Sequence, residues 1–327
     1  VELSKADLTD KKELPGACLK VTDENGNPVD EWVSKEEAHI IKGLIVGKKY
    51  KMTETKPADG YVTAESIEFT VENTKEVQKH QMLDDVTKVE ISKKDITDSS
   101  EVPGAKLIIL DKDGKKVESW TSTDKPHMVE KLPVGEYTLR EEQAPDGYLI
   151  AEDVKFTVKD TGKVQKVKMK DAHPYGKLVI KKTDSTSKAA LPGAEFELRE
   201  KESGKVVEKL VTDKTGTATS GKIPIATYKN GKVEKTVEYI LVETKAPNGY
   251  ELSSKKEEIR FEYKDGKTKV IEIVKEIKNT KSPSGSTPTG NSPKTGDSTN
   301  IWLPILLAVL SACGIGGVIW YKKKKGN

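Results

Sequence analysis

Apolar and polar residues alternate along short segments of this chain, and the alternation predicts β-strands. Near the start, Val1 and Leu3 are apolar, and Lys5 follows on the same strand face, because side chains alternate between the two faces. The same order recurs at Val89, Ile91 and Lys93 and at Leu178, Ile180 and Lys182. Each repeat therefore places a lysine on a strand face that is otherwise apolar.

Two later strands of each repeat also direct a polar side chain to the apolar face. In one strand a tyrosine and an apolar residue precede a glutamate at alternate positions, and the last strand carries an aspartate or asparagine in the same way. The glutamates are Glu54, Glu141 and Glu243, and the last-strand residues are Asp84, Asp171 and Asn279. Because burying an unpaired charge is costly, this recurring trio calls for a chemical explanation.

The spacing of matched residues defines three repeats of an all-β fold. Lys5 and Lys93 are 88 residues apart, and the third repeat is longer through an insertion that contains Asn230-Gly231, a dipeptide typical of hairpin turns. Short alternating segments between turn signals predict three tandem β-sandwiches. The predicted parts are residues 1–87, 88–175 and 176–281 for the sandwiches, 282–300 for a linker, 301–321 for a transmembrane helix and 322–327 for a basic tail.

The composition changes after Lys281. Ser, Pro, Thr and Gly predominate up to residue 300, which is typical of a flexible, disordered linker. Ile301–Tyr321 then gives 21 residues without a charge, which is long enough to span a bilayer, and Lys322–Lys325 form a basic cluster that stays cytoplasmic. A plain membrane anchor is one interpretation. The pentapeptide before the span offers another, and its residues are Ser292, Pro293, Lys294, Thr295 and Gly296.

The order of pentapeptide, apolar segment and basic tail resembles the LPXTG-like cell-wall sorting signal of Gram-positive surface proteins. In that family a sortase cysteine attacks the Thr–Gly bond and joins the threonine carboxyl to an amine of the peptidoglycan or of a pilin. The resemblance implies cleavage after Thr295 and an extracellular, wall-anchored protein that starts as a membrane-inserted precursor. Ser292 replaces the leucine of the family pattern, which leaves the sortase class open.

Two further elements resemble Cna B-type repeats, the SpaA-like, prealbumin-like sandwiches of adhesin stalks and pilins. One is the LPGA or VPGA tetrapeptide at Leu14–Ala17, Val102–Ala105 and Leu191–Ala194, and the other ends in Gly-Tyr at Tyr61, Tyr148 and Tyr250. In that family a first-strand lysine forms an isopeptide bond with a last-strand Asp or Asn, assisted by a buried glutamate. The implied pairs are Lys5–Asp84, Lys93–Asp171 and Lys182–Asn279, with Glu54, Glu141 and Glu243 as catalytic proton shuttles.

Burial makes this chemistry feasible. A buried amine loses the hydration that favours its charge, so its pKa falls, whereas a buried carboxyl group keeps its proton and can polarise the acceptor carbonyl. Folding holds the reacting groups together, which replaces a bimolecular encounter. A buried ion pair is the alternative, and it fits the third repeat less well because Asn279 carries no charge.

Charge and composition argue against several other functions. The net charge of +3 comes from the C-terminal tail, so the remainder gives no electrostatic reason to bind nucleic acid. The four histidines lie in separate segments without metal-ligand spacing, and no phosphate-binding loop or GxSxG motif occurs. We therefore expect no cofactor, no metal and no enzyme activity beyond autocatalytic bond formation.

Cys18 and Cys313 cannot form a disulfide, because they lie in separate parts of the chain, and Cys18 is expected to be a small buried residue. Trp32 and Trp120 are expected to pack against the cores.

The sequence favours the wall-anchored stalk of a Gram-positive surface adhesin, with sortase as a partner and Thr295 as the attachment point. Because the chain starts inside a strand, we expect further N-terminal domains, through which host extracellular matrix could bind. One alternative is a pilin subunit polymerised by sortase, since Tyr228-Lys229-Asn230 resembles a pilin motif without its proline. Another is the spacer of a surface enzyme whose catalytic domain precedes this fragment.

Overall fold

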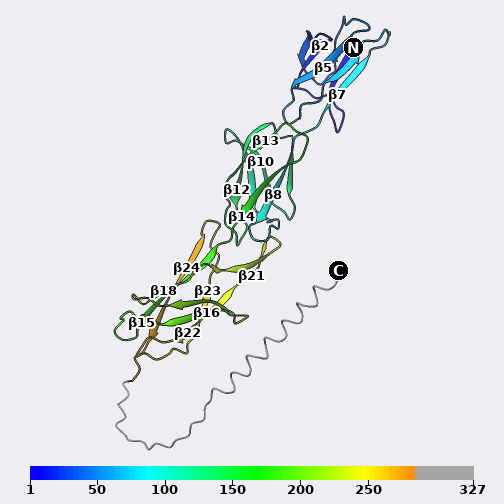
Figure 1. Ribbon diagram of the computed structural model, residues 1–327. Coiled ribbons are helices and arrows are strands. Elements are labelled where there is room, and N and C mark those ends of the chain that lie inside the picture. The colour runs from blue at the N-terminus through cyan, green and yellow to red at the C-terminus, as the bar shows by residue number, and fades with distance from the viewer. Residues whose placement is uncertain (284–327) are drawn as a thin grey trace, which may run out of the picture. The chain divides into compact units, whose positions relative to one another are not determined.

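The computed structural model describes residues 1–283, and these residues form only strands and connecting loops (Figure 1). The predicted all-β class is therefore confirmed. In this part of the chain, no helix is long and apolar enough to cross a membrane. The predicted sorting motif, transmembrane helix and basic tail lie outside the described residues, as does all but the start of the linker.

The first repeat consists of two sheets that share one core. The three-stranded sheet has the order β4-β1-β7, and the four-stranded sheet has the order β3-β2-β5-β6. Both sheets contribute side chains to the core, including Leu3 and Met82 from one and Val21 and Met52 from the other. The strands are β1 (Glu2–Asp7), β2 (Cys18–Asp23), β3 (Pro28–Val33), β4 (His39–Ile40), β5 (Lys49–Lys56), β6 (Ile67–Thr70) and β7 (Lys79–Asp84).

The second repeat has the same arrangement. Its sheets have the orders β11-β8-β14 and β10-β9-β12-β13. Val89 and Met169 from the smaller sheet meet Ile109 and Leu139 from the larger one in the core. The strands are β8 (Lys88–Asp95), β9 (Lys106–Asp111), β10 (Lys116–Thr121), β11 (His127–Glu130), β12 (Gly135–Gln143), β13 (Val154–Val158) and β14 (Gln165–Asp171).

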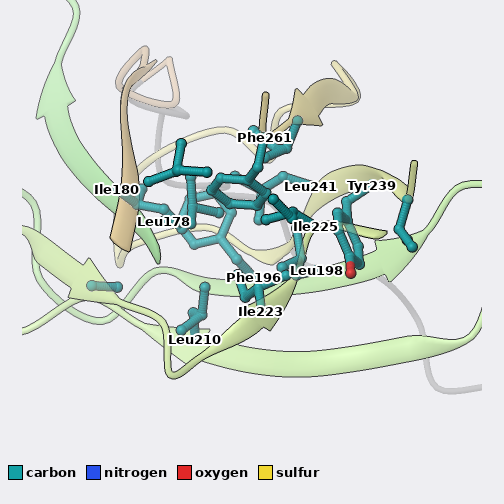
Figure 2. Packing of buried hydrophobic residues seen from close by; sticks show 14 of the residues in the cluster. Leu178, Ile180, Phe196, Leu198, Leu210, Ile223, Ile225, Tyr239, Leu241 and Phe261 are labelled. Atoms are coloured by element: carbon teal, nitrogen blue, oxygen red, sulfur yellow. The ribbon is translucent and has the colours of Figure 1, made fainter. Parts of the chain in front are cut away.

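The third repeat keeps both sheets and adds a hairpin. One sheet has the order β17-β16-β22-β23, and in the other β15 pairs with β18, β19 and β24. Figure 2 shows Leu178 and Ile180 of β15 packed among apolar side chains such as Phe196 and Phe261. The strands are β15 (Tyr175–Asp184), β16 (Glu195–Glu200), β17 (Val206–Val211), β18 (Thr217–Thr219), β19 (Ile223–Pro224), β20 (Ala226–Lys229), β21 (Lys232–Thr236), β22 (Glu238–Lys245), β23 (Glu257–Arg260) and β24 (Val270–Asn279).

The first and last strands of every repeat pair in parallel. In the first repeat the register sets Lys5 opposite Met82 and Asp7 opposite Asp84, so the lysine and Asp84 are two positions out of step. Because residues two positions apart share a face, both side chains point to the same side of the sheet. The pairs β8–β14 and β15–β24 have the same offset between lysine and last-strand residue.

The insertion in the third repeat forms the predicted hairpin. Strands β20 and β21 pair across Asn230-Gly231, and both turn residues have positive φ angles of 53° and 69°, which is the conformation of a type I′ turn. The hairpin contacts the second repeat. The Tyr228 ring stacks on His173 at a centroid distance of 3.5 Å, and the Tyr228 hydroxyl donates a hydrogen bond of 2.8 Å to the Gly147 carbonyl.

Two expectations about single side chains have different outcomes. Trp32 and Trp120 pack, partly buried, against the first and second cores, as predicted. The prediction that Cys18 is buried is wrong, because it is only partly shielded from solvent. Its neighbours Ala17 and Leu19 occupy the inward positions, so the alternation of β2 turns Cys18 toward the outer face.

The close approach of the hairpin to the second repeat can be tested at Gly231. A Cβ atom at this position would lie 1.8 Å from the Glu101 carbonyl oxygen, whereas a Cβ at Gly204, which has the same φ of +69°, would meet nothing within 4 Å. We expect Gly204→Ala to cost about 1 kcal/mol through its left-handed backbone alone. Gly231→Ala should cost clearly more, as measured by thermal unfolding. Equal losses would show that the hairpin does not press against the second repeat.

Candidate cross-linking sites

A buried cluster of three polar side chains lies inside the first repeat. Lys5 comes from β1, Asp84 from β7 in the same sheet, and Glu54 from β5 in the opposite sheet. The Lys5 Nζ atom lies 2.8 Å from Glu54 Oε1 and contacts Asp84 Oδ1. All three residues are at most 4% exposed. The cluster therefore joins the first strand, the last strand and the facing sheet.

Equivalent clusters occur in the other two repeats. Lys93 Nζ lies 2.9 Å from Glu141 Oε2 and contacts Asp171 Oδ1. In the third repeat, Lys182 Nζ lies 3.0 Å from Glu243 Oε1 and contacts the Asn279 side-chain oxygen. These six residues are also at most 4% exposed. The structure thus brings together every lysine, glutamate and last-strand residue that the sequence singled out, and whether a bond joins them stays a prediction.

A backbone N–H group orients the glutamate of each cluster. The donor lies ten residues after the glutamate, in the loop that follows the Gly-Tyr motif. Ala64 donates to Glu54 Oε2 at 2.6 Å, Ala151 to Glu141 Oε2 at 2.7 Å, and Ser253 to Glu243 Oε2 at 2.9 Å. Because a hydrogen bond fixes one carboxyl oxygen, the whole carboxyl group stays directed toward the lysine.

Burial changes the protonation of these clusters. Desolvation raises the pKa of Asp84 and of Asp171 to about 7, although the neighbouring lysine favours the charged form. In the third repeat, desolvation lowers the pKa of Lys182. Within residues 1–283, Asp84 Oδ2 and Asp171 Oδ2 have no hydrogen-bond partner. Burial therefore favours the neutral acid form of Asp84 and Asp171 and the neutral amine form of Lys182.

The glutamate of the third cluster contacts both the lysine and the last-strand asparagine. Asn279 Nδ2 donates hydrogen bonds of 2.9 and 3.1 Å to the two carboxyl oxygens of Glu243. The same glutamate lies within reach of the Lys182 amine. One carboxyl group can therefore exchange protons with the amine and with the side-chain amide nitrogen.

Sequence reasoning missed a second hydrogen-bonded pair beside each cluster, which is fully buried in the first two repeats and partly buried in the third. A tyrosine of the Gly-Tyr motif donates a hydrogen bond to an aspartate that follows the cluster lysine by two positions. That fixed spacing, present in all three repeats, was the available signal. The pairs are Tyr61–Asp7 at 2.8 Å, Tyr148–Asp95 at 2.8 Å and Tyr250–Asp184 at 2.9 Å.

The LPGA and VPGA tetrapeptides are turns that a hydroxyl group holds in place. Ser34 Oγ donates to the Leu14 carbonyl at 2.6 Å and accepts from the Ala17 N–H at 2.9 Å. Gly16 between them has a φ of 99°, which only glycine adopts easily. Ser122 and Thr212 make the same two bonds in the other repeats. This turn fixes the segment that runs beside the cluster lysine.

Other candidate residues do not form a site. Within the described part of the chain, no group of His, Cys, Asp and Glu side chains could hold a metal ion. The Lys229 side chain is 68% exposed at the tip of the hairpin, 3.9 Å from Glu234.

Comparisons with known proteins agree with this architecture. A family model described as a SpaA prealbumin-like fold domain matches residues 1–85, 87–173 and 176–277. A search of curated protein sequences gives no match. Among solved structures, the Bacillus anthracis TIE protein is 29% identical with a TM-score of 0.56, and the match covers 86% of this chain and 50% of that one. The chain therefore spans half the length of that protein.

Two pilin structures are more distant matches. BcpA, the major pilin subunit of Bacillus cereus, is 19% identical with a TM-score of 0.47, and the match covers 86% of this chain and 99% of that one. The major pilin SpaD from Corynebacterium diphtheriae is 19% identical with a TM-score of 0.40, and the match covers 86% and 97% of the two chains.

The tyrosine–aspartate pair can be tested through its effect on acid stability. Burial alone would raise the pKa of Asp7, but hydrogen bonds from the Thr9 N–H, Tyr61 and Lys131 lower it from 3.8 to about 2. A lowered folded-state pKa stabilises the fold above pH 3.8, and this stabilisation is lost as the pH falls toward 2.

Tyr61→Phe should therefore destabilise the first repeat by about 1–2 kcal/mol at neutral pH, and by less as the pH falls from about 4 to 2. Chemical unfolding across this pH range measures the effect. Tyr50→Phe, which removes a hydroxyl of the same repeat that accepts from the Ile45 N–H, is the control. A deficit that does not change with pH would contradict the assigned role of Asp7.

Proposed function

Since the chain belongs to the family of SpaA prealbumin-like fold domains, we propose that it is the wall-anchored stalk region of a Gram-positive surface adhesin. Intramolecular isopeptide bonds stiffen the stalk, and a sortase attaches it to the wall. The observation that carries this proposal is the buried cluster that links the first and last strands of all three repeats. The proposed bonds are Lys5–Asp84, Lys93–Asp171 and Lys182–Asn279.

The proposed reaction is an acyl transfer in which the neutral lysine amine attacks the last-strand carbonyl carbon. In the first two repeats the new C–N bond replaces the C–OH bond of the aspartic acid, and water leaves. In the third repeat it replaces the C–NH₂ bond of Asn279, and ammonia leaves. The cluster glutamate takes a proton from the amine and delivers one to the leaving group, which completes the balance. A pKa of about 7 supports a neutral, attackable acid at Asp84 and Asp171.

The burial of the clusters argues against a purely structural ion pair. Each lysine of the first two repeats faces two carboxyl groups, so full ionisation would leave excess negative charge in a dry interior. Buried ion pairs stabilise proteins poorly because desolvation offsets their attraction. A covalent amide removes the charges of both the lysine and the last-strand aspartate.

Such bonds would suit a protein under tension. Force that enters along β1 and leaves along β7 shears the parallel pair, and the bond between Lys5 and Asp84 would carry that force directly. The two residues are 79 positions apart, so on the order of 260 Å of chain could not be pulled out. Closing a loop of this length contributes about 4.5 kcal/mol if it behaves as a disulfide does in the chain-entropy model.

Wall attachment through Thr295 rests on the sequence of the C-terminal segment. The proposed partners are a sortase and an amine of the peptidoglycan, or of a pilin if the chain polymerises. Host extracellular matrix is a further proposed partner of the adhesin. The precursor would be held in the membrane by residues 301–321 while the sortase cuts between Thr295 and Gly296.

Intact-mass measurement tests the cross-links. The full 327-residue chain should weigh less than its sequence by two waters and one ammonia. Glu141→Ala should restore one water, because the second repeat loses its proton shuttle. Glu142→Ala is the matched control, since Glu142 is the exposed neighbour on the same strand. A wild-type mass equal to the full sequence would leave the ion-pair interpretation.

Cell fractionation tests the attachment. Thr295→Ala should make the protein extractable by detergent, whereas Thr299→Ala, four residues further on, should leave it attached to the wall. Digested wall fragments from wild-type cells should contain a peptide that ends in Thr295. If no such peptide is found, a plain membrane anchor remains. Ser292→Leu should increase attachment by a sortase that prefers leucine at this position.

A further inference from the structure

The backbone N–H of the cluster lysine faces a gap in the sheet in the first two repeats. Strand β4 pairs with β1 only at Glu2 and Leu3, and β11 pairs with β8 only as far as Ile91. Both ladders therefore stop two residues before the lysine. A buried N–H group without a partner is costly, so another acceptor is needed at this point.

A second glutamate fills that gap. In the second repeat, Glu101 Oε2 accepts a hydrogen bond of 3.0 Å from the Lys93 N–H, while the Val102 N–H donates to the Lys93 carbonyl at 2.7 Å. In the first repeat, Glu13 Oε2 accepts from the Lys5 N–H at 3.2 Å. The carboxylate oxygen thus replaces the backbone carbonyl acceptor that a longer neighbouring strand would supply.

Neither of these glutamates belongs to the proton-shuttle clusters, yet both are held in place. The Glu101 side chain is only 7% exposed, and its Oε1 atom lies 2.8 Å from Lys94 Nζ. Glu13 Oε1 accepts a hydrogen bond from the Ser4 hydroxyl. Hydrogen bonds to a charged acceptor are stronger than neutral ones, so these carboxylates can fix the lysine backbone firmly.

The third repeat meets the same need in another way. Ala190 occupies the equivalent position, and the Lys182 N–H donates instead to the Gly216 carbonyl at 2.7 Å. Here strand β18 pairs as far as Lys181, so the turn that contains Gly216 continues the ladder. Gly216 has a φ of +71°, and a Cβ there would lie 2.5 Å from the Lys182 carbonyl oxygen and 3.2 Å from the Ala190 Cβ. The small residue Ala190 therefore accompanies the close approach of the Gly216 turn to Lys182.

We propose that Glu13 and Glu101 are positioning residues for the cross-linking reaction, and that the Gly216 turn replaces them in the third repeat. They hold the lysine backbone so that the amine stays at the acceptor carbon. This inference rests on the proposed isopeptide chemistry. Attack requires the reacting atoms to remain about 3–3.5 Å apart, and a displacement of about 1 Å can slow a reaction a hundredfold.

The test follows each bond separately in the full chain. Cell-free synthesis is stopped at intervals, the protein is digested, and each cross-linked peptide is quantified by mass spectrometry. Glu101→Ala should slow the Lys93–Asp171 bond about tenfold or more, while the bonds of the first and third repeats in the same molecule keep their rates. Glu101→Gln, which retains an acceptor oxygen, should restore most of the rate.

A matched variant separates positioning from general destabilisation. Tyr148→Phe weakens the second repeat through Asp95 without touching the Lys93 N–H. It should leave the rate of the Lys93–Asp171 bond unchanged. Gly216→Ala should slow only the Lys182–Asn279 bond.

The inference is overturned if Glu101→Ala forms the bond at the wild-type rate, or if Tyr148→Phe slows it equally. Absence of every cross-link from the wild-type chain would instead overturn the proposed function.

Discussion

The parallel pairing of the first and last strands is the constraint on which each repeat depends. Neighbouring strands lie about 4.8 Å apart, so a two-residue offset in register brings a long lysine side chain to a short aspartate or asparagine on the adjacent strand. A parallel pair also needs a long crossover, and nearly the whole repeat lies between the two strands. Any link at this point therefore closes almost the entire domain.

The facing sheet supplies the glutamate of each cluster, which the parallel pair of first and last strands does not contain. Glu54, Glu141 and Glu243 come from β5, β12 and β22, which belong to the opposite layer of each sandwich. Their loop N–H partners hold them toward the lysine. The geometry of each cluster thus depends on correct closure of the two layers, so a repeat can complete its cluster only after its core has formed.

Alternation along the strands was enough to direct Lys93, Glu141 and Asp171 toward the core, because face assignment within a strand depends only on odd and even positions. Alternation also puts Asp95 on the face of Lys93, two positions further along β8, but it could not predict the partners of Asp95 or of Glu101. Their contacts depend on where a ladder ends and how a loop returns, which are properties of register and not of a single strand. The same limit applies to the hairpin: Asn-Gly predicted its turn, but not that it would contact another repeat.

The contact between that hairpin and the second repeat limits how the repeats can be exchanged. Gly231 lies directly against the Glu101 carbonyl, and Tyr228 covers His173. The hairpin of the third repeat therefore covers part of the surface of the second repeat. Recombination that duplicated or reordered the repeats would separate these matched surfaces. The second and third copies can therefore make this contact only as adjacent neighbours, and a chain that emerges N-terminus first leaves the second copy without the hairpin until residues 226–236 have been translated.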